Sequence, residues 1–391
     1  MRQPGSTFKI VSTYAPALDE LGLTLATTFE DEEYSYPDGS PVNNASGTYG
    51  GPTSIRTAIT NSINVVAVKC LEEVTPDLGL KYLLDRFGFT TLATGDETKD
   101  VDYLGNVWSD ANLATALGGI THGVTNVELC AAYAAIANGG HYIKPVYYTR
   151  IEDRNGNVLI DKTNSAPKDA VKETTAWLLT SAMENVVTEG TGTACRINGQ
   201  VVAGKTGTTE AYNDLWFVGY TPYYTCAVWS GYDNNEKIPD EGREFHKVLW
   251  QKVMSRIHAG LEYKDFPKPA AITQATVCSE TGLLANDFCP EVTEYFDVNT
   301  VPQEYCEEHT YYRYLYNYGY YDDYGNFIPY DFDEYDYDSY GQDTGQDTSG
   351  YMTYDDYGNV TGGYGGYGGY GGYGGYGGYG GSPGDGTITY Y

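Results

Sequence analysis

The chain has 391 residues, of which 41% are hydrophobic, and it carries a formal net charge of −30. This charge repels nucleic-acid phosphates and anionic membrane surfaces, so we expect no nucleic-acid partner. No apolar run approaches the roughly 20 residues of a membrane helix and no signal-peptide pattern opens the chain, so the sequence as given predicts neither an anchor nor an export signal.

Helices predominate in the first half of the chain. Apolar residues at helical spacing predict a buried helix over residues 6–21, and Pro16 is expected to kink that helix or end it nearby. A polar loop follows over 37–52, and Thr53 is the expected cap of a helix over 54–72. The same spacing predicts further helices over 78–87, 127–138 and 173–187.

The pattern then changes to short β-branched and aromatic runs separated by turns. These runs predict adjacent antiparallel strands over 201–203, 215–220 and 225–232. A closing amphipathic helix is predicted over 244–258, and its expected buried face consists of Phe245, Val248, Leu249, Val253 and Ile257. Helices, then strands, then a helix indicate an α/β fold class, specifically an α+β sandwich with an antiparallel sheet flanked by helices.

Composition divides the chain into three predicted parts. Residues 1–262 resemble a globular domain, and 263–310 form a short extension that is interrupted by prolines and contains three cysteines. Over 311–391 aliphatic residues almost vanish, Tyr, Gly and Asp dominate, and Gly-Gly-Tyr repeats occupy 362–381. Such a segment buries too little apolar surface to offset its ordering entropy, so we predict a disordered tail.

Three short motifs occur in a fixed order in the first part. They are Ser6-Thr7-Phe8-Lys9, Ser62-Ile63-Asn64 and Lys205-Thr206-Gly207, the last followed by Thr208 and Thr209. Each alone has an ordinary structural explanation, since Ser-x-x-Lys at a helix start is usually a cap with an exposed lysine. Together, in helix, helix-to-loop and strand contexts, the motifs predict serine-based acyl transfer.

The first two motifs supply the expected nucleophile and its proton-transfer groups. Ser6 and Lys9 share a helix face, so the Lys9 amine can act as the base that activates the Ser6 hydroxyl. The N–H of Ser6 at the helix start is an expected oxyanion donor. Ser62 is expected to return a proton to the leaving amine, and Asn64 is expected to hold a substrate amide.

The third motif supplies the expected substrate edge. It follows an apolar run, so we place it at the edge of a strand, where Gly207 permits close approach of an extended peptide. The cation of Lys205, which we count among the catalytic residues, and the hydroxyls of Thr206, Thr208 and Thr209 suit a terminal carboxylate. The N–H of Thr208 is the expected second oxyanion donor.

The sequence around these motifs resembles the transpeptidase domain of class A penicillin-binding proteins over about residues 1–260. The resemblance rests on the segments 2–9, 55–59, 118–125, 186–193, 203–209 and 214–222. It implies an αβ-sandwich serine acyl-transferase that cross-links peptidoglycan stem peptides ending in D-Ala-D-Ala. It also implies acylation by β-lactam antibiotics, no cofactor, other cell-wall synthesis proteins as partners, and a full-length parent at the extracytoplasmic face of the bacterial membrane.

The same sequence features allow other functions. A penicillin-binding sensor or an inactive truncated pseudoenzyme would carry the same motifs, and a structural or adhesion protein would act through the tail. Class A β-lactamases carry a Glu-x-x-Leu-Asn motif, which is missing between Asn64 and Lys205, so slow hydrolysis of the acyl-enzyme is expected. The family's domain has strands before the serine helix, and we therefore expect an N-terminally truncated domain with an open sheet edge.

The seven cysteines fall into two groups. The first four, Cys70, Cys130, Cys195 and Cys226, lie singly in apolar contexts and are expected to be buried thiols. Cys278, Cys289, Cys306 and His309 allow two interpretations, a zinc site or one disulfide with a thiol left over. The long gap before Cys306 and the oxidising compartment that the resemblance implies favour the disulfide, so no metal is expected.

Overall fold

The computed structural model describes residues 1–163, 166–209 and 211–310, and four short segments, 319–321, 327–329, 353–354 and 360–362. Residues 1–310 form one compact unit and 311–391 a second. The second unit contains two antiparallel pairs, β14 (Gly319–Tyr321) with β15 (Phe327–Pro329) and β16 (Thr353–Tyr354) with β17 (Val360–Gly362). The rest of the predicted disordered tail lies outside the described residues.

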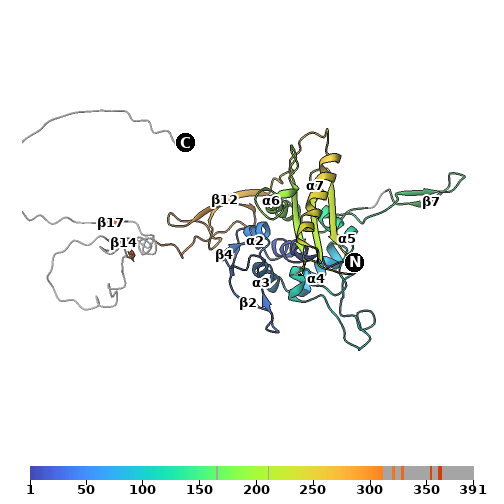
Figure 1. The fold of residues 1–391 in the computed structure, drawn as a ribbon. Helices are drawn as coiled ribbons and strands as arrows, with labels where there is room; N and C mark the ends of the chain where they lie inside the picture. The colour runs from blue at the N-terminus through green and yellow to red at the C-terminus, as the bar shows by residue number, and fades with distance from the viewer. Residues whose placement is uncertain are drawn as a thin grey trace, which may run out of the picture. The chain divides into compact units, whose positions relative to one another are not determined.

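A three-stranded antiparallel sheet lies at the centre of the first unit (Figure 1). Its order is β11 (Thr225–Gly231), β10 (Asp214–Tyr220) and β9 (Ala203–Thr208), so β10 is the middle strand. Every residue of β10 is buried, as expected for a strand paired on both edges and covered on both faces. The structure confirms the predicted strands over 215–220 and 225–232, whereas the strand predicted over 201–203 begins only at Ala203 and continues through the Lys205 motif to Thr208.

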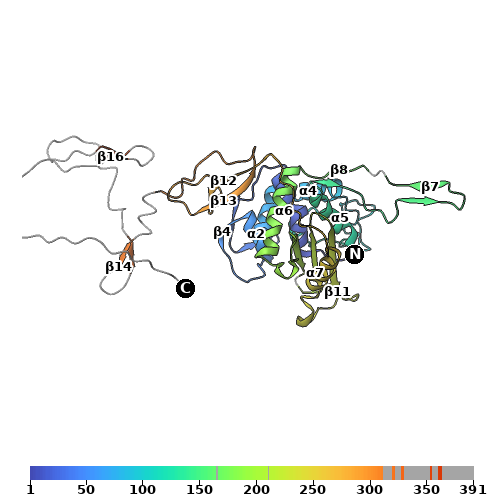
Figure 2. The ribbon, with the colours of Figure 1, turned by 90° about the horizontal axis from the view of Figure 1, so that it is seen from above.

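Helices cover both faces of this sheet (Figure 2). Trp216 and Val218 belong to the main core, which also contains the buried faces of α5 (Asn126–Ala137) and α6 (Glu173–Thr188). Phe217 points to the other face and packs with Trp250 and Met254 of α7 (Phe245–Ile257). This alternation follows from the two-residue period of a strand, and the arrangement confirms the predicted helix-flanked antiparallel sheet.

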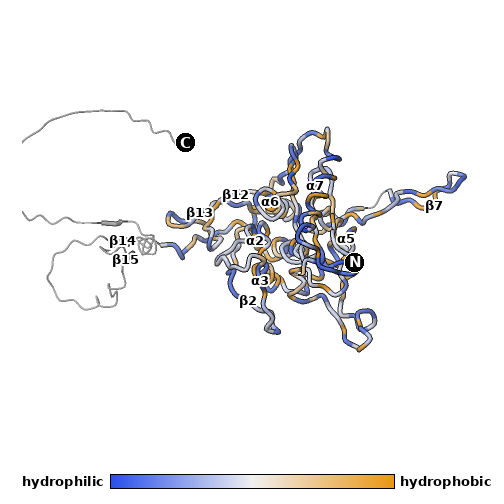
Figure 3. The backbone as a smooth tube through the Cα atoms, in the orientation of Figure 1, coloured by the Kyte–Doolittle hydropathy of each residue, from blue (hydrophilic) through white to orange (hydrophobic). Residues whose placement is uncertain are grey.

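The remaining helices and strands of the first unit surround this sandwich, and apolar segments run through its interior (Figure 3). The other helices are α1 (Ala15–Asp19), α2 (Ile55–Asn61), α3 (Asn64–Val74) and α4 (Pro76–Lys81). The paired strands are β1 (Thr28–Asp31) with β4 (Gly51–Ser54), β2 (Tyr34–Ser35) with β3 (Pro41–Val42), β5 (His141–Tyr142) with β8 (Lys168–Asp169), β6 (Arg150–Glu152) with β7 (Val158–Asp161), and β12 (Ile272–Cys278) with β13 (Glu291–Asp297).

Short 3-10 and π-helical turns complete the unit. The 3-10 turns are Gly5–Thr7, Leu113–Leu117, Thr193–Cys195 and Asp240–Gly242, and the π-helical turns are Lys9–Tyr14 and Tyr82–Arg86. The second π turn continues α4 over the predicted 78–87 helix. Among the described residues, no helix has both the length and the apolar content needed to cross a membrane.

Two predicted helices differ in detail from the observed ones. The first is a 3-10 turn, a π turn and α1 in succession, and Pro16 lies in the first turn of α1, where its missing N–H costs nothing. The predicted 54–72 helix is two helices, because Ser62 adopts a left-handed conformation with φ 59° and ends α2. The cap of α2 is Ser54, whose hydroxyl accepts from the N–H of Thr57, and Thr53 belongs to β4.

The buried face of α7 also differs from the predicted one. The apolar residues predicted to face the core are 37% to 57% exposed: Phe245, Val248, Leu249, Val253 and Ile257. The buried residues are instead His246, Trp250 and Met254. Both faces of this helix carry apolar side chains. The face with Trp250 is the buried one, and the large indole of Trp250 packs edge-on against Phe217 with ring centroids 4.9 Å apart.

Candidate active site

The segment before α1 places Ser6 beside the end of strand β9. Gly5 has φ +55°, and a side chain on it would lie 2.8 Å from the carbonyl oxygen of Thr208. Only glycine permits this backbone approach. The segment is further held by two hydrogen bonds, from Trp216 Nε1 to the carbonyl of Gln3 at 2.9 Å and from the Tyr133 hydroxyl to the carbonyl of Thr7 at 2.6 Å. Ser6, which is half-buried, therefore sits next to the third motif.

Lys9 is fully buried and its ammonium group reaches the second motif. Its Nζ donates to the carbonyl oxygens of Ser62 at 2.7 Å and Ile63 at 3.1 Å, and to Oδ1 of Asn64 at 2.6 Å. The Ser62 hydroxyl lies 3.3 Å from the same nitrogen. Burial and, secondarily, the positive charge of Lys205 hold the pKa of Lys9 well below its usual range. The neutral amine that a general base requires is therefore accessible.

The break between α2 and α3 presents the second motif to Lys9. The left-handed Ser62 ends α2, Ile63 is extended, and Asn64 begins α3. A non-glycine residue in this conformation stores strain, which structures retain mostly at functional sites. Because α2 stops here, the carbonyls of Ser62 and Ile63 are free to accept from Lys9. The side-chain amide of Asn64 donates to the carbonyl of Asn43 at 2.7 Å, which fixes its orientation.

Lys205 lies within β9, on the outer edge of the sheet. Its side chain is fully buried, and burial lowers the pKa of its ammonium group to about 7. Its Nζ lies 3.5 Å from the carbonyl oxygen of Thr206, the hydrogen-bond partner that the structure gives it. The positive charge of Lys205 helps to lower the pKa of Lys9, and a protonated Lys205 gives this strand edge a positive potential that attracts a carboxylate.

The four residues after Lys205 have different environments. The Thr206 hydroxyl pairs with that of Thr191 at 2.7 Å. Gly207 packs so tightly that a side chain on it would lie 2.5 Å from the carbonyl of Pro4, whereas Thr208 at the strand end is exposed. Thr209 belongs to the β9–β10 turn, where its hydroxyl accepts from the N–H of Asp214 at 3.0 Å.

Sequence patterns did not indicate the residues that hold this site in place. Asn44 accepts from the N–H groups of Asn64 at 2.9 Å and Val65 at 3.2 Å, so it caps α3 from a distant loop. Asn44 is itself held by Asp31, which accepts from its side-chain amide at 2.7 Å. Only local spacing can indicate a cap in a sequence, and Asn44 lies 20 positions before Asn64. Thr191 lies in the 186–193 segment, to which we assigned no role.

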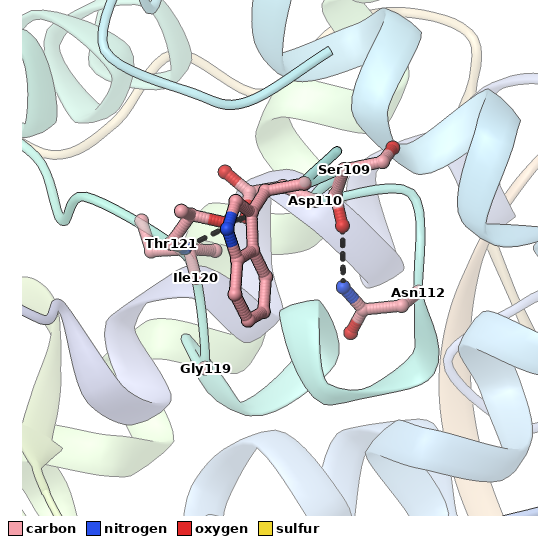
Figure 4. A pocket seen from close by; sticks show the side chains of 7 residues that line it. Ser109, Asp110, Asn112, Gly119, Ile120 and Thr121 are labelled. Atoms are coloured by element: carbon pink, nitrogen blue, oxygen red, sulfur yellow. Dashed lines mark hydrogen bonds between the residues drawn. The ribbon is translucent and has the colours of Figure 1, made fainter. Parts of the chain in front are cut away.

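A cavity of about 360 Å³ opens near the segment that contains Ser6 (Figure 4). It is lined by Trp108, Ser109, Asp110, Asn112, Gly119, Ile120 and Thr121, so none of its lining residues belongs to the three motifs. Asp110 is buried and accepts from the Thr121 hydroxyl and N–H, both at 2.7 Å. These bonds stiffen the loop whose neighbouring residue Gly118 packs against the backbone of Gly5. The loop therefore supports the segment that contains Ser6 from behind.

Comparison with known proteins identifies the family. Residues 1–254 match the family model described as the penicillin binding protein transpeptidase domain. The chain belongs to this transpeptidase family. It is 33% identical over 326 residues to penicillin-binding protein 1A of Clostridium tetani and 34% identical over 325 residues to penicillin-binding protein 1A/1B of Bacillus subtilis. These alignments cover 79% and 77% of the chain but only 40% and 33% of the two relatives, so the chain spans well under half of their length.

Solved structures share the transpeptidase fold. Penicillin-binding protein 1A from Haemophilus influenzae aligns with a TM-score of 0.63 at 22% identity, covering 78% of this chain and 49% of that one. The D,D-transpeptidase domain of a peptidoglycan glycosyltransferase from Eggerthella lenta aligns with a TM-score of 0.52 at 26% identity, covering 66% and 65%. The PonA1 protein of Mycobacterium tuberculosis, solved in complex with penicillin V, aligns with a TM-score of 0.59 at 24% identity, covering 69% and 72%.

A second family model matches the extension that follows the transpeptidase domain. Residues 268–311 match the model described as the penicillin-binding protein 1A C-terminal domain. In the structure this segment packs on the transpeptidase domain through Glu294 of β13, which accepts from Arg56 of α2 at 2.6 and 2.7 Å. The same guanidinium donates to Asn185 of α6 at 2.6 Å. The C-terminal segment is thus fixed to the helix that ends at Ser62.

Proposed function

We propose that this chain is a serine-type D,D-transpeptidase that forms an acyl-enzyme with stem peptides ending in D-Ala-D-Ala. The observation that carries the proposal is the convergence of the three motifs on one site, with Lys9 bonded to Ser62 and Asn64 and with Gly5 packed against Thr208. Membership of the transpeptidase family supports it. We place the reaction at the extracytoplasmic face of the membrane, where peptidoglycan is accessible.

The proposed reaction begins when Ser6 Oγ attacks the carbonyl carbon of the penultimate D-Ala and its proton passes to neutral Lys9. The N–H groups of Ser6 and Thr208 stabilise the oxyanion. When the C–N bond breaks, the leaving amine of the last D-Ala takes a proton from the Ser62 hydroxyl, which is replenished by Lys9 across the 3.3 Å contact. An acceptor amine then attacks the ester carbonyl and gives a proton to Lys9. As the bond between Ser6 Oγ and the acyl carbon breaks, Lys9 passes this proton to Oγ, so that the new peptide bond and the free Ser6 hydroxyl are formed.

Substrate recognition is assigned to the edge of β9. Lys205, assisted by the Thr206 and Thr208 hydroxyls, would bind the terminal carboxylate, and the strand edge beside Gly207 would pair with the extended peptide. Asn64 would hold a side-chain or backbone amide of the peptide. Thr209 is the weakest member of this set, because its hydroxyl is already engaged by Asp214. β-Lactam antibiotics, which place an amide carbonyl near a carboxylate, would acylate Ser6 by the same steps.

Labelling with a fluorescent penicillin tests the proposal. Ser6→Ala should abolish covalent labelling, because it removes the hydroxyl to which we assign the ester, whereas Ser46→Ala on an exposed loop should label normally. Labelling that persists at another residue in Ser6→Ala would refute the assignment. Release of D-Ala from a D-Ala-D-Ala peptide then separates an active transpeptidase from a penicillin-binding sensor or pseudoenzyme, which would label without turnover.

A further inference from the structure

A compact set of sulfur and nitrogen atoms lies in the C-terminal segment, away from the acyl-transfer residues. Sγ of Cys278, Cys289 and Cys306 and one ring nitrogen of His309 all lie within 4.8 Å of one another. The three cysteines are free thiols, as are the other four in the chain, so the predicted disulfide is not formed. We propose that Cys278, Cys289, Cys306 and His309 bind one structural zinc ion.

The distances within this set fit a tetrahedral zinc site. His309 Nδ1 lies 3.4 Å from Sγ of Cys278 and 3.3 Å from Sγ of Cys306. Zinc bonds of about 2.3 Å to sulfur and about 2.05 Å to nitrogen, at tetrahedral angles, separate the two ligand atoms by about 3.5 Å and two sulfurs by about 3.8 Å. Since no pair in the set exceeds 4.8 Å, closing the tetrahedron requires shifts of about 1 Å or less.

The imidazole of His309 is oriented as a metal ligand. Its other nitrogen, Nε2, lies 3.1 Å from a carboxylate oxygen of Glu280. A carboxylate that accepts from one ring nitrogen leaves the lone pair on the other, and this carboxylate–histidine arrangement is common behind zinc ligands. Glu280 therefore holds the His309 ring with Nδ1 directed at the three sulfurs.

The four proposed ligands come from three stretches of chain, and hydrogen bonds of Asn286 join three of them. Cys278 ends β12, Cys289 lies in the β12–β13 loop, and Cys306 and His309 follow β13. The side-chain amide of Asn286 donates to the carbonyls of Cys306 at 2.7 Å and His309 at 2.8 Å, and its N–H lies 3.4 Å from Sγ of Cys289. One residue thus contacts three of the four proposed ligands.

The part of the segment around the four proposed ligands has only a small apolar core. Its hydrophobic cluster contains three buried residues, Val277, Phe296 and Ala26, and Ala26 comes from the transpeptidase domain. A unit of this size rarely folds on an apolar core alone and usually needs a metal or disulfides. A disulfide would join two of the thiols at about 2.05 Å and leave the third thiol and His309 without a role. A zinc ion uses all four.

Zinc binding is balanced by proton release. Three thiols lose their protons to become thiolates, His309 binds as the neutral imidazole, and the Zn²⁺ site carries a net charge of −1. Because all four positions are filled by protein, no water is activated and the site is structural. Its expected effect is to clamp the ends of β12 and β13, and so to hold Glu294 against Arg56.

Metal analysis of the full chain, purified without a metal-affinity tag or chelator, tests the proposal. We expect one equivalent of zinc per chain, and replacement by Co²⁺ should give the absorption bands of a tetrahedral thiolate site. Cys289→Ser and His309→Ala should lose the zinc, and Glu280→Gln should weaken its binding about 10- to 100-fold. The matched controls Cys130→Ser and His141→Ala should each retain one equivalent.

Two further measurements keep the test independent of misfolding in the variants. His309→Cys restores a fourth ligand and should keep the zinc, which a purely structural histidine would not predict. Intact-mass measurement of the wild-type chain should show all seven cysteines reduced once zinc is removed by a chelator. Zinc-free protein lighter by two hydrogen atoms would overturn the proposal in favour of a disulfide, and so would zinc that is retained by both Cys289→Ser and His309→Ala.

Discussion

Lys205 is the residue whose environment most restricts its role. It is fully buried on an edge strand, and within the described structure the Thr206 carbonyl at 3.5 Å is its one hydrogen-bond partner. A buried cation with so little compensation is costly unless a ligand supplies the counter-charge. Lys205→Ala should therefore lower the rate of acylation by roughly 10²-fold or more. Stopped-flow acylation by a chromogenic cephalosporin measures this, with Lys69→Ala as the control, and an unchanged rate would refute the role.

The two buried lysines also predict the pH dependence of acylation. As the pH falls through the lowered pKa of Lys9, the amine becomes protonated and can no longer accept the Ser6 proton, so the rate falls. As the pH rises through about 7, Lys205 loses the charge that binds the carboxylate, so the rate falls again. The second-order rate of penicillin acylation should thus be bell-shaped in pH.

Lys205→Arg separates the two limbs of this profile. Arginine stays protonated throughout the accessible range, so the alkaline limb should disappear while the acid limb of Lys9 remains. Lys69→Arg, on a lysine that pairs with Glu32 and lies outside the three motifs, should leave both limbs in place. An alkaline limb that persists in Lys205→Arg would show that another group controls it.

At the scale of helices and strands, the sequence predicted the elements that a local residue pattern specifies. The helices α5 and α6 and the strands β9 to β11 lie within a few residues of their predicted positions, because each follows a single uninterrupted pattern. The break at Ser62 was missed because its left-handed turn is compensated by Lys9, which is 53 positions away. The three motifs were found because each is short, but their supports, Asn44 and Thr191, are contacts that only the fold creates.

The contact between α2 and β13 makes a prediction about stability. Glu294 is buried and paired with Arg56, so Glu294→Ala leaves the guanidinium without its negatively charged partner. Breaking such a pair should lower the free energy of unfolding by roughly 3 kcal/mol. Glu32→Ala removes an exposed carboxylate that pairs with Lys69 and should cost less than about 1 kcal/mol. Denaturant unfolding of the two variants measures both, and equal effects would contradict the prediction.

At the scale of the whole molecule, two surfaces of the sandwich could associate with another chain: the outer edge of strand β11 and the outer face of α7. Strand β11 pairs with β10 on one edge, and within the described residues no strand pairs with its other edge. The outer face of α7 exposes five large apolar side chains, from Phe245 to Ile257. An open sheet edge and a continuous apolar helix face are typical sites of association between chains. The wrongly predicted buried face of α7 is therefore the surface from which we expect self-association.

The net charge decides when that association appears. At low ionic strength the charge of −30 keeps copies apart, and at physiological salt the Debye length of about 8 Å screens the repulsion. The weight-average mass in analytical ultracentrifugation should therefore rise with both protein and salt concentration. Phe245→Lys combined with Val253→Lys should restore a monomer, because the two lysines interrupt the apolar face. The control Lys252→Glu, on the same helix, changes the charge without removing apolar area and should still associate. A wild-type chain that stays monomeric at high salt, or a double variant that associates as strongly as the wild type, would show that this face of α7 does not mediate self-association.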